Sequence, residues 1–128
     1  MSWTNREAAT GDALPVVLTE YIARLLFAAV FIYAVMGKLA ATAVIQELMT
    51  ATGVPAILIW PAVLLELAIA VSMVTGYAWR VVMPVGAIYL IVLGVLFHFR
   101  PESQADMISL MKNLSLAGGM ILLGFRSR

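Results

Sequence analysis

The chain has 128 residues, of which 63% are apolar and only 12% are charged, and its formal net charge is +1. A water-soluble domain of this size is roughly 45–50% apolar and about one quarter charged, because its large surface must be solvated. The composition therefore excludes an ordinary soluble protein and predicts a surface that faces the lipid bilayer. The small net charge leaves no basic surface field for nucleic acid, so we expect no nucleic-acid partner.

Four apolar runs are each about as long as the ~20 residues that a helix needs to cross a ~30 Å hydrocarbon core. They cover residues 14–37, 54–76, 79–99 and 107–125. The short link at residues 77–78 predicts an antiparallel hairpin of the second and third helices. Residues 39–52 predict a short helix lying in the membrane interface. The predicted fold is therefore all-α: a single-domain, integral-membrane, antiparallel up-down four-helix bundle.

Residues at the ends of these runs support the proposed limits. Ser103 followed by Asp106 predicts a capping box at the start of the fourth helix. Three aromatic residues near run ends are interpreted as anchors at the membrane–water interface: Trp60, Tyr77 and Trp79. Glycines inside the later runs predict close approach between helices: Gly86, Gly94, Gly118 and Gly119.

The four spans place both termini on one side of the membrane. That side carries four arginines, Arg6, Arg80, Arg126 and Arg128, whereas the other side carries Lys38 and Arg100, with Lys112 just inside. Positively charged residues concentrate on the cytoplasmic side of membrane proteins. We therefore expect a multi-pass protein of the inner (cytoplasmic) membrane with both termini in the cytoplasm.

Cysteine is absent and His98 is the sole histidine. These counts exclude a disulfide framework, an iron–sulfur cluster, a Cys-based zinc site, and a multi-histidine metal or haem site within one chain. We expect no metal site and no covalently bound cofactor. A redox role would require electrons from another protein.

Several ionisable or polar residues fall inside the apolar runs or at their ends: Arg24, Lys38, Glu66, His98, Lys112 and Asn113. Each ionisable group in lipid costs at least ~2.5–3.5 kcal/mol, so such groups normally face the bundle interior and pair. From the predicted limits, Glu66 lies about 18 Å and Arg24 about 20 Å below the side opposite the termini. Equal depth predicts an Arg24–Glu66 pair.

Lys112 starts about 9 Å below the same side, and its long side chain is expected to reach inward toward Glu66. The prediction is a polar core of Arg24, Glu66 and Lys112 that opens toward Lys38 and His98. One carboxylate cannot neutralise this many cations, and a surplus cation in a low dielectric either loses its proton or awaits an electronegative ligand. The same ion pairs would equally serve to fix the helix register.

Several short motifs follow one another along the chain: Arg24-Leu25-Leu26, Gly37-Lys38, Gly53-Val54-Pro55, Leu65-Glu66, Gly76 with Arg80, Phe97-His98, Lys112-Asn113-Leu114 and Gly118-Gly119. Their order and spacing resemble the DoxX family of small four-helix membrane proteins. The resemblance runs from Arg24 to about Gly124. It implies an inner-membrane four-helix fold and assigns the family's polar positions to the six residues named above, without giving any of them a catalytic role.

Relatives in this family are associated with quinone-linked sulfur oxidation, terminal oxidase subunits and membrane oxidoreductase complexes. The surplus intramembrane cation and the absence of a redox centre in the chain lead to the main hypothesis, a subunit that binds a quinone or another small electronegative ligand. In this hypothesis Lys112, Asn113 and His98 are the donors, Glu66 holds Lys112 and Arg24 and passes protons, and an oxidoreductase partner supplies the electrons. The alternative is a non-catalytic scaffold or assembly subunit whose buried ion pairs are structural. A transporter or proton path is a third candidate function. Association of this chain into a homo-oligomer is left open.

Overall fold

The computed structural model describes residues 13–125, so Arg6, Arg126 and Arg128 lie outside the described residues. Its elements in chain order are the helices α2 (Ala13–Ala40) and α3 (Thr42–Ala51), the 3-10 turn η1 (Ala56–Leu58), and the helices α4 (Ile59–Thr75), α5 (Trp79–His98) and α6 (Gln104–Phe125). In this part of the chain, four helical segments are long and apolar enough to cross a membrane. The all-helical membrane fold and the short helix between the first two spans are confirmed.

Two helix starts differ from the sequence prediction. Pro55 has an extended backbone and is followed by η1, so α4 proper begins at Ile59 rather than at residue 54. The last helix begins three residues early, at Gln104, because the Ser103 hydroxyl oxygen accepts the backbone N–H of Asp106 at 3.3 Å. That bond is the forward half of the predicted capping box. Helix α2 also continues to Ala40, three residues past the expected end.

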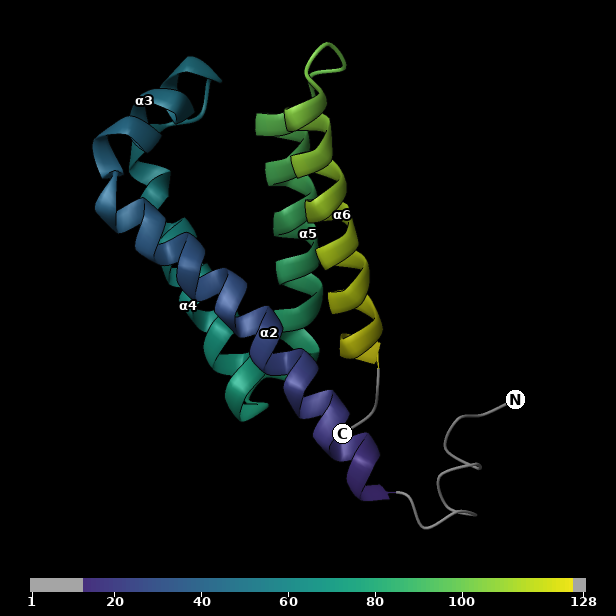
Figure 1. The fold of residues 1–128 in the computed structure, drawn as a ribbon. Helices are drawn as coiled ribbons and strands as arrows, with labels where there is room; N and C mark the ends of the chain where they lie inside the picture. The colour runs from purple at the N-terminus through teal and green to yellow at the C-terminus, as the bar shows by residue number, and fades with distance from the viewer. Residues whose placement is uncertain (1–12, 126–128) are drawn as a thin grey trace.

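The helices form two antiparallel pairs, α2 with α4 and α5 with α6, and these pairs have the most extensive contacts (Figure 1). The pairs come together near the turn between α4 and α5 and diverge toward the end that carries α3 and the α5–α6 loop. Gly76 (φ 76°) and Ala78 (φ 54°) take left-handed backbone conformations that allow this tight turn. The short link therefore joins two helices that pack against other partners more closely than against each other.

Each helix buries one stripe of side chains. In α2 the buried residues are Arg24, Ala28, Phe31 and Val35, which alternate four and three residues apart. Helix α4 has the same spacing at Ile59, Val63, Glu66, Ala70 and Met73. The remaining faces expose large apolar side chains, such as Leu26 at 66% and Leu122 at 69%. Such faces suit contact with lipid. The alternating spacings of four and three residues add up to a seven-residue repeat, which is the period at which long helices pack in near-parallel bundles.

Three of the four glycines expected at close helix approaches lie at such contacts. A Cβ on Gly94 would lie 2.9 Å from Leu110 Cδ1, and one on Gly119 would lie 2.7 Å from Phe27 Cζ. A Cβ on Gly86 would meet the Met120 side chain. A Cβ on Gly118 would meet nothing within 4 Å, so the expectation is wrong for that residue.

Candidate functional site

Glu66 is the centre of a polar cluster that joins three helices. Its side chain is buried in α4, and its Oε1 accepts hydrogen bonds from Lys38 Nζ of α2 at 2.8 Å and from the Tyr89 hydroxyl of α5 at 2.9 Å. Its other oxygen, Oε2, is buried without a hydrogen-bond partner among the described residues. We call Lys38, Glu66 and Tyr89 the Glu66 cluster. Because it links α2 and α4 to α5, it spans the space between the two helix pairs.

The predicted Arg24–Glu66 pair is wrong, because the cation that reaches Glu66 is Lys38. The error comes from the start of α4. With the helix beginning at Ile59, Glu66 lies about 10 Å, rather than about 18 Å, below that start. This shift places Glu66 closer to the α3 end, within reach of the long side chain of Lys38 in the last turn of α2.

Tyr89 was not predicted, although the sequence contains a signal for it. Glu66 lies eleven residues before Tyr77 in the turn, and Tyr89 lies twelve residues after it. Residues at equal distances from a tight turn lie at equal depth in an antiparallel helical hairpin. Counting from the turn would therefore have matched Tyr89 to Glu66.

Arg24 has a different role at the opposite end of the molecule. Its Nε donates to the carbonyl oxygen of Met73 at 2.7 Å, and its guanidinium carbon lies 4.8 Å from the centre of the Trp79 ring. Met73 is in the last turn of α4, where carbonyls lack partners within the helix and a cation is favourable. Arg24 thus caps the C-terminus of α4.

Trp79 also caps a helix, so its assignment as an interface anchor is wrong. It is 5% exposed, and its indole N–H donates to the carbonyl oxygen of Leu123 at 2.8 Å. Leu123 lies in the last turn of α6. Because Arg24 stacks on the same indole, the two caps connect α2, α4, α5 and α6 at one end of the bundle.

His98 does not join the Glu66 cluster. Its Nδ1 lies 3.2 Å from Asp106 Oδ1, and Arg100 Nη1 lies 3.9 Å from Asp106 Oδ2. His98 ends α5 and Asp106 lies in the first turn of α6, so these contacts hold the two ends of the loop together. The prediction that the polar core opens toward His98 is therefore wrong.

Lys112 does not reach inward to Glu66, contrary to the prediction. It is exposed, and within residues 13–125 it forms no hydrogen bond or ion pair. It lines a groove of about 680 Å³ between α2 and α6. Apart from Lys112 the groove is lined by Val30, Gln104, Met107, Ile108, Met111, Ser115 and Leu116.

Beyond the residues that line the groove, α6 packs directly against α2. Gly119, seven residues after Lys112 and on the same face of α6, has Phe27 of α2 against it. Toward the α3 end, where the pairs diverge in Figure 1, Val30 and Lys112 line the two sides. Asn113 points elsewhere: it is half-buried and its side chain lies near Gly94 of α5. The groove therefore holds one predicted polar residue, Lys112.

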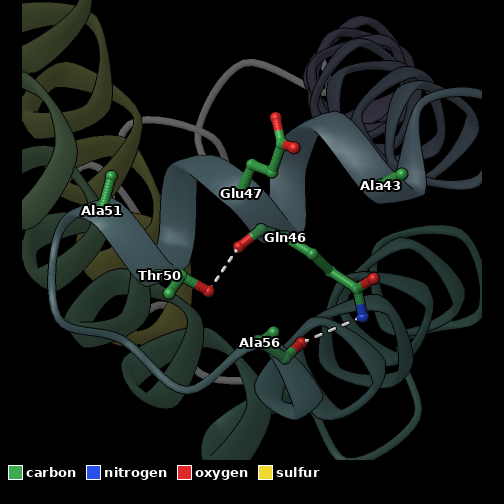
Figure 2. A pocket seen from close by; sticks show the side chains of 6 residues that line it. All are labelled: Ala43, Gln46, Glu47, Thr50, Ala51 and Ala56. Carbon is green, nitrogen blue, oxygen red and sulfur yellow. Dashed lines mark hydrogen bonds between the residues drawn. The ribbon is translucent and has the colours of Figure 1, made fainter.

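A second hollow, of about 570 Å³, lies on α3 and is shown in Figure 2. The Gln46 side-chain amide donates to the carbonyl oxygen of Ala56 at 3.3 Å, and the Thr50 hydroxyl donates to the Gln46 carbonyl oxygen at 2.9 Å. Glu47 points away from Ala56 in this view. The first of these bonds ties α3 to η1 and so fixes the position from which α4 begins.

The comparisons with known proteins agree with this architecture. The sequence model of the DoxX family matches residues 20–99. The chain belongs to the DoxX family. The match includes the whole Glu66 cluster, Arg24 and His98, whereas Lys112 and Asn113 lie beyond its end.

A curated relative places this DoxX-family chain in a membrane. It is similar to the inner membrane protein YqjF of Escherichia coli (strain K12), with 31% identity over 102 residues that cover 80% of this chain and 78% of the relative. No solved structure matches the chain. Together with the four long apolar helices, these findings make it a multi-pass inner-membrane protein.

Proposed function

We propose that this DoxX-family protein is the ligand-binding subunit of a membrane oxidoreductase system and holds a quinone-like molecule in the groove between α2 and α6. The observation that carries the proposal is the position of Lys112 within the spanning helix α6. An ammonium group within a spanning helix is costly unless it is compensated, and Lys112 has no compensating group among the described residues. An electronegative ligand would supply it.

The lining of the groove suits the two ends of such a ligand. A quinone has carbonyl oxygens that accept hydrogen bonds, and Lys112 Nζ has three donor positions. Met107, Met111 and Leu116 offer an apolar wall for an isoprenoid tail, and the volume of about 680 Å³ lies within the usual range for small-molecule sites. When bound, a quinone supplies two-electron redox chemistry, and this cysteine-free chain would receive the electrons from a partner protein.

The first prediction concerns ligand retention in the Lys112→Met variant. Methionine keeps the length and apolar stem of lysine but removes the charged donor, whose hydrogen bond is worth about 1.5–3 kcal/mol. We expect at least a roughly tenfold loss of affinity for an added ubiquinone analogue. The measurement is quinone binding to purified protein in lipid nanodiscs, together with the quinone extracted from the protein as isolated.

Arg80→Met is the matched control, because Arg80 is an exposed cation outside the groove. It should retain the affinity of the wild type. Quinone binding that is equal in Lys112→Met and wild type, or absent from both, contradicts the proposal.

A non-catalytic scaffold is the second candidate, and one observation favours it. Arg24, Lys38, Glu66 and His98 all make bonds between different helices, as structural residues would. In that case the Lys112 substitution would change neither quinone binding nor the recovery of a stable partner protein on purification.

We also propose that the termini face the cytoplasm. Arg80 lies at the α4–α5 turn, on the side of the termini, and Arg6, Arg126 and Arg128 add to that side, whereas Lys38 and Arg100 lie at the other end. The positive-inside rule supports this orientation. It would place α3 and the α5–α6 loop on the periplasmic side.

A further inference from the structure

The Glu66 cluster has an uneven arrangement of donors. Lys38 Nζ and the Tyr89 hydroxyl both donate to Oε1, and Oε2 is buried with no donor from the described residues. A buried carboxylate oxygen without a hydrogen bond carries a large desolvation cost while the group is charged. Oε2 is therefore the atom at which a proton can bind without displacing an existing donor.

We propose that Glu66 is an exchangeable proton-binding site inside the membrane, separate from the Lys112 groove and independent of any ligand bound there. In this reaction the carboxylate takes a proton from a hydronium ion at Oε2, one O–H bond forms, and water leaves. No electron is transferred. The reverse reaction returns the proton to water.

The two partners of Glu66 fit both protonation states. The Tyr89 hydroxyl donates to Oε1 whether Oε2 is charged or protonated, so α5 stays connected to α4. Lys38 is the counter-ion of the charged state only. Its side chain is 18% exposed while that of Glu66 is 3% exposed, so the ammonium group can regain solvent when the carboxylate is neutralised. Loss of the ion pair therefore does not leave a cation buried.

Exchange with water is expected from the α3 side. Lys38 lies in the last turn of α2, next to the start of α3, where the Thr42 hydroxyl donates to the Lys38 carbonyl oxygen at 2.8 Å. Among the described residues, the ionisable side chains that contact Glu66 are Lys38 from α2 and Tyr89 from α5. Helix α3, which also packs against α4, carries one acidic group, the exposed Glu47.

Infrared difference spectroscopy tests this site directly. The full-length protein is labelled with ¹³C-carboxyl glutamate, reconstituted in nanodiscs and acidified while circular dichroism monitors helix content. Beside the bands of the other labelled glutamates, we expect a protonated-carboxyl band of one group per chain that is lost in Glu66→Gln and retained in Glu47→Gln. The absence of this Glu66 band at every pH at which the helices persist overturns the proposal.

Lys38→Met provides a second measurement at neutral pH. A buried carboxylate that has lost its counter-ion neutralises itself by binding a proton. The Glu66 band should therefore be present at neutral pH in Lys38→Met and absent in wild type, whereas Lys38→Arg should match wild type. A folded Lys38→Met protein without the band shows that Glu66 is structural, and this result is independent of quinone binding. If Lys38→Met does not fold, the wild-type titration decides.

Discussion

At the scale of single residues, Arg24 and Lys38 show that two cations on one face of the same helix can have unrelated roles. They lie fourteen residues apart, and each meets a different part of α4. Lys38 neutralises a buried carboxylate, while Arg24 donates to a helix-terminal carbonyl and stacks on Trp79. The role of each cation is therefore set by the group of α4 that lies at its depth in the membrane.

Arg24→Lys should destabilise the protein even though the charge is kept. Lysine has no Nε–H in the position that reaches Met73, and an ammonium group does not stack on an indole as a planar guanidinium does. We expect a loss of about 1–3 kcal/mol in the free energy of unfolding, the cost of a buried carbonyl left without its donor. Unfolding in mixed micelles by added SDS, followed by circular dichroism, measures it. The exposed Arg80→Lys should change it by less than about 0.5 kcal/mol, and equal effects would refute the capping role.

At the scale of helices, the contact between α2 and α6 depends on one glycine of an adjacent pair. Phe27 of α2 occupies the space that a side chain at Gly119 would need, whereas Gly118 faces open space. This contact lies about one helical turn beyond Ser115 and Leu116, which line the groove. The separation of α2 and α6 at this point is therefore encoded by the small size of residue 119.

Gly119→Leu should destabilise the bundle by about 1–3 kcal/mol, the usual cost of forcing extra volume into a packed contact. Gly118→Leu should leave stability unchanged within about 0.5 kcal/mol or raise it, because leucine has the higher helix propensity. The same SDS titration compares the pair. If the two variants unfold alike, Phe27 does not pack against α6 as described.

At the scale of the whole molecule, the two ends of the bundle differ. One end is closed by the α4–α5 turn and the Arg24 and Trp79 caps. At the other end the helix pairs diverge, and α3 and the α5–α6 loop project (Figure 1). Under the two proposals above, this asymmetry would give the ligand and the proton one favoured side of entry, so both proposals depend on the orientation in the membrane.

The orientation is testable because the chain has no cysteine to cause background labelling. In intact cells, a membrane-impermeant maleimide should label Glu102→Cys in the α5–α6 loop and not Tyr77→Cys in the turn. Both residues are exposed, so each should react after the membrane is permeabilised. The reverse pattern would place the termini outside.

The number of spans, the membrane location and the family followed from the sequence alone, because hydrophobic length and motif order do not depend on how helices pack. The sequence also identified Lys38 and Glu66 as polar positions. The partner predicted for Glu66 was wrong because α4 starts five residues later than expected. At a rise of about 1.5 Å per residue, this later start changes the depth of Glu66 in the membrane by about 7.5 Å.

Only the tertiary structure decided which of the few charges meet. Pairing depends on where η1 ends, how α2 crosses α4, and how far the helix pairs diverge, and none of these is a property of one segment. Close packing at Gly86, Gly94 and Gly119 sets the distances between neighbouring helices, and these distances decide which side chains can meet. The sequence thus determined a bilayer-spanning bundle with costly internal charges, and packing between helices determined that Lys38 and Tyr89 hold Glu66 while Lys112 lines the groove.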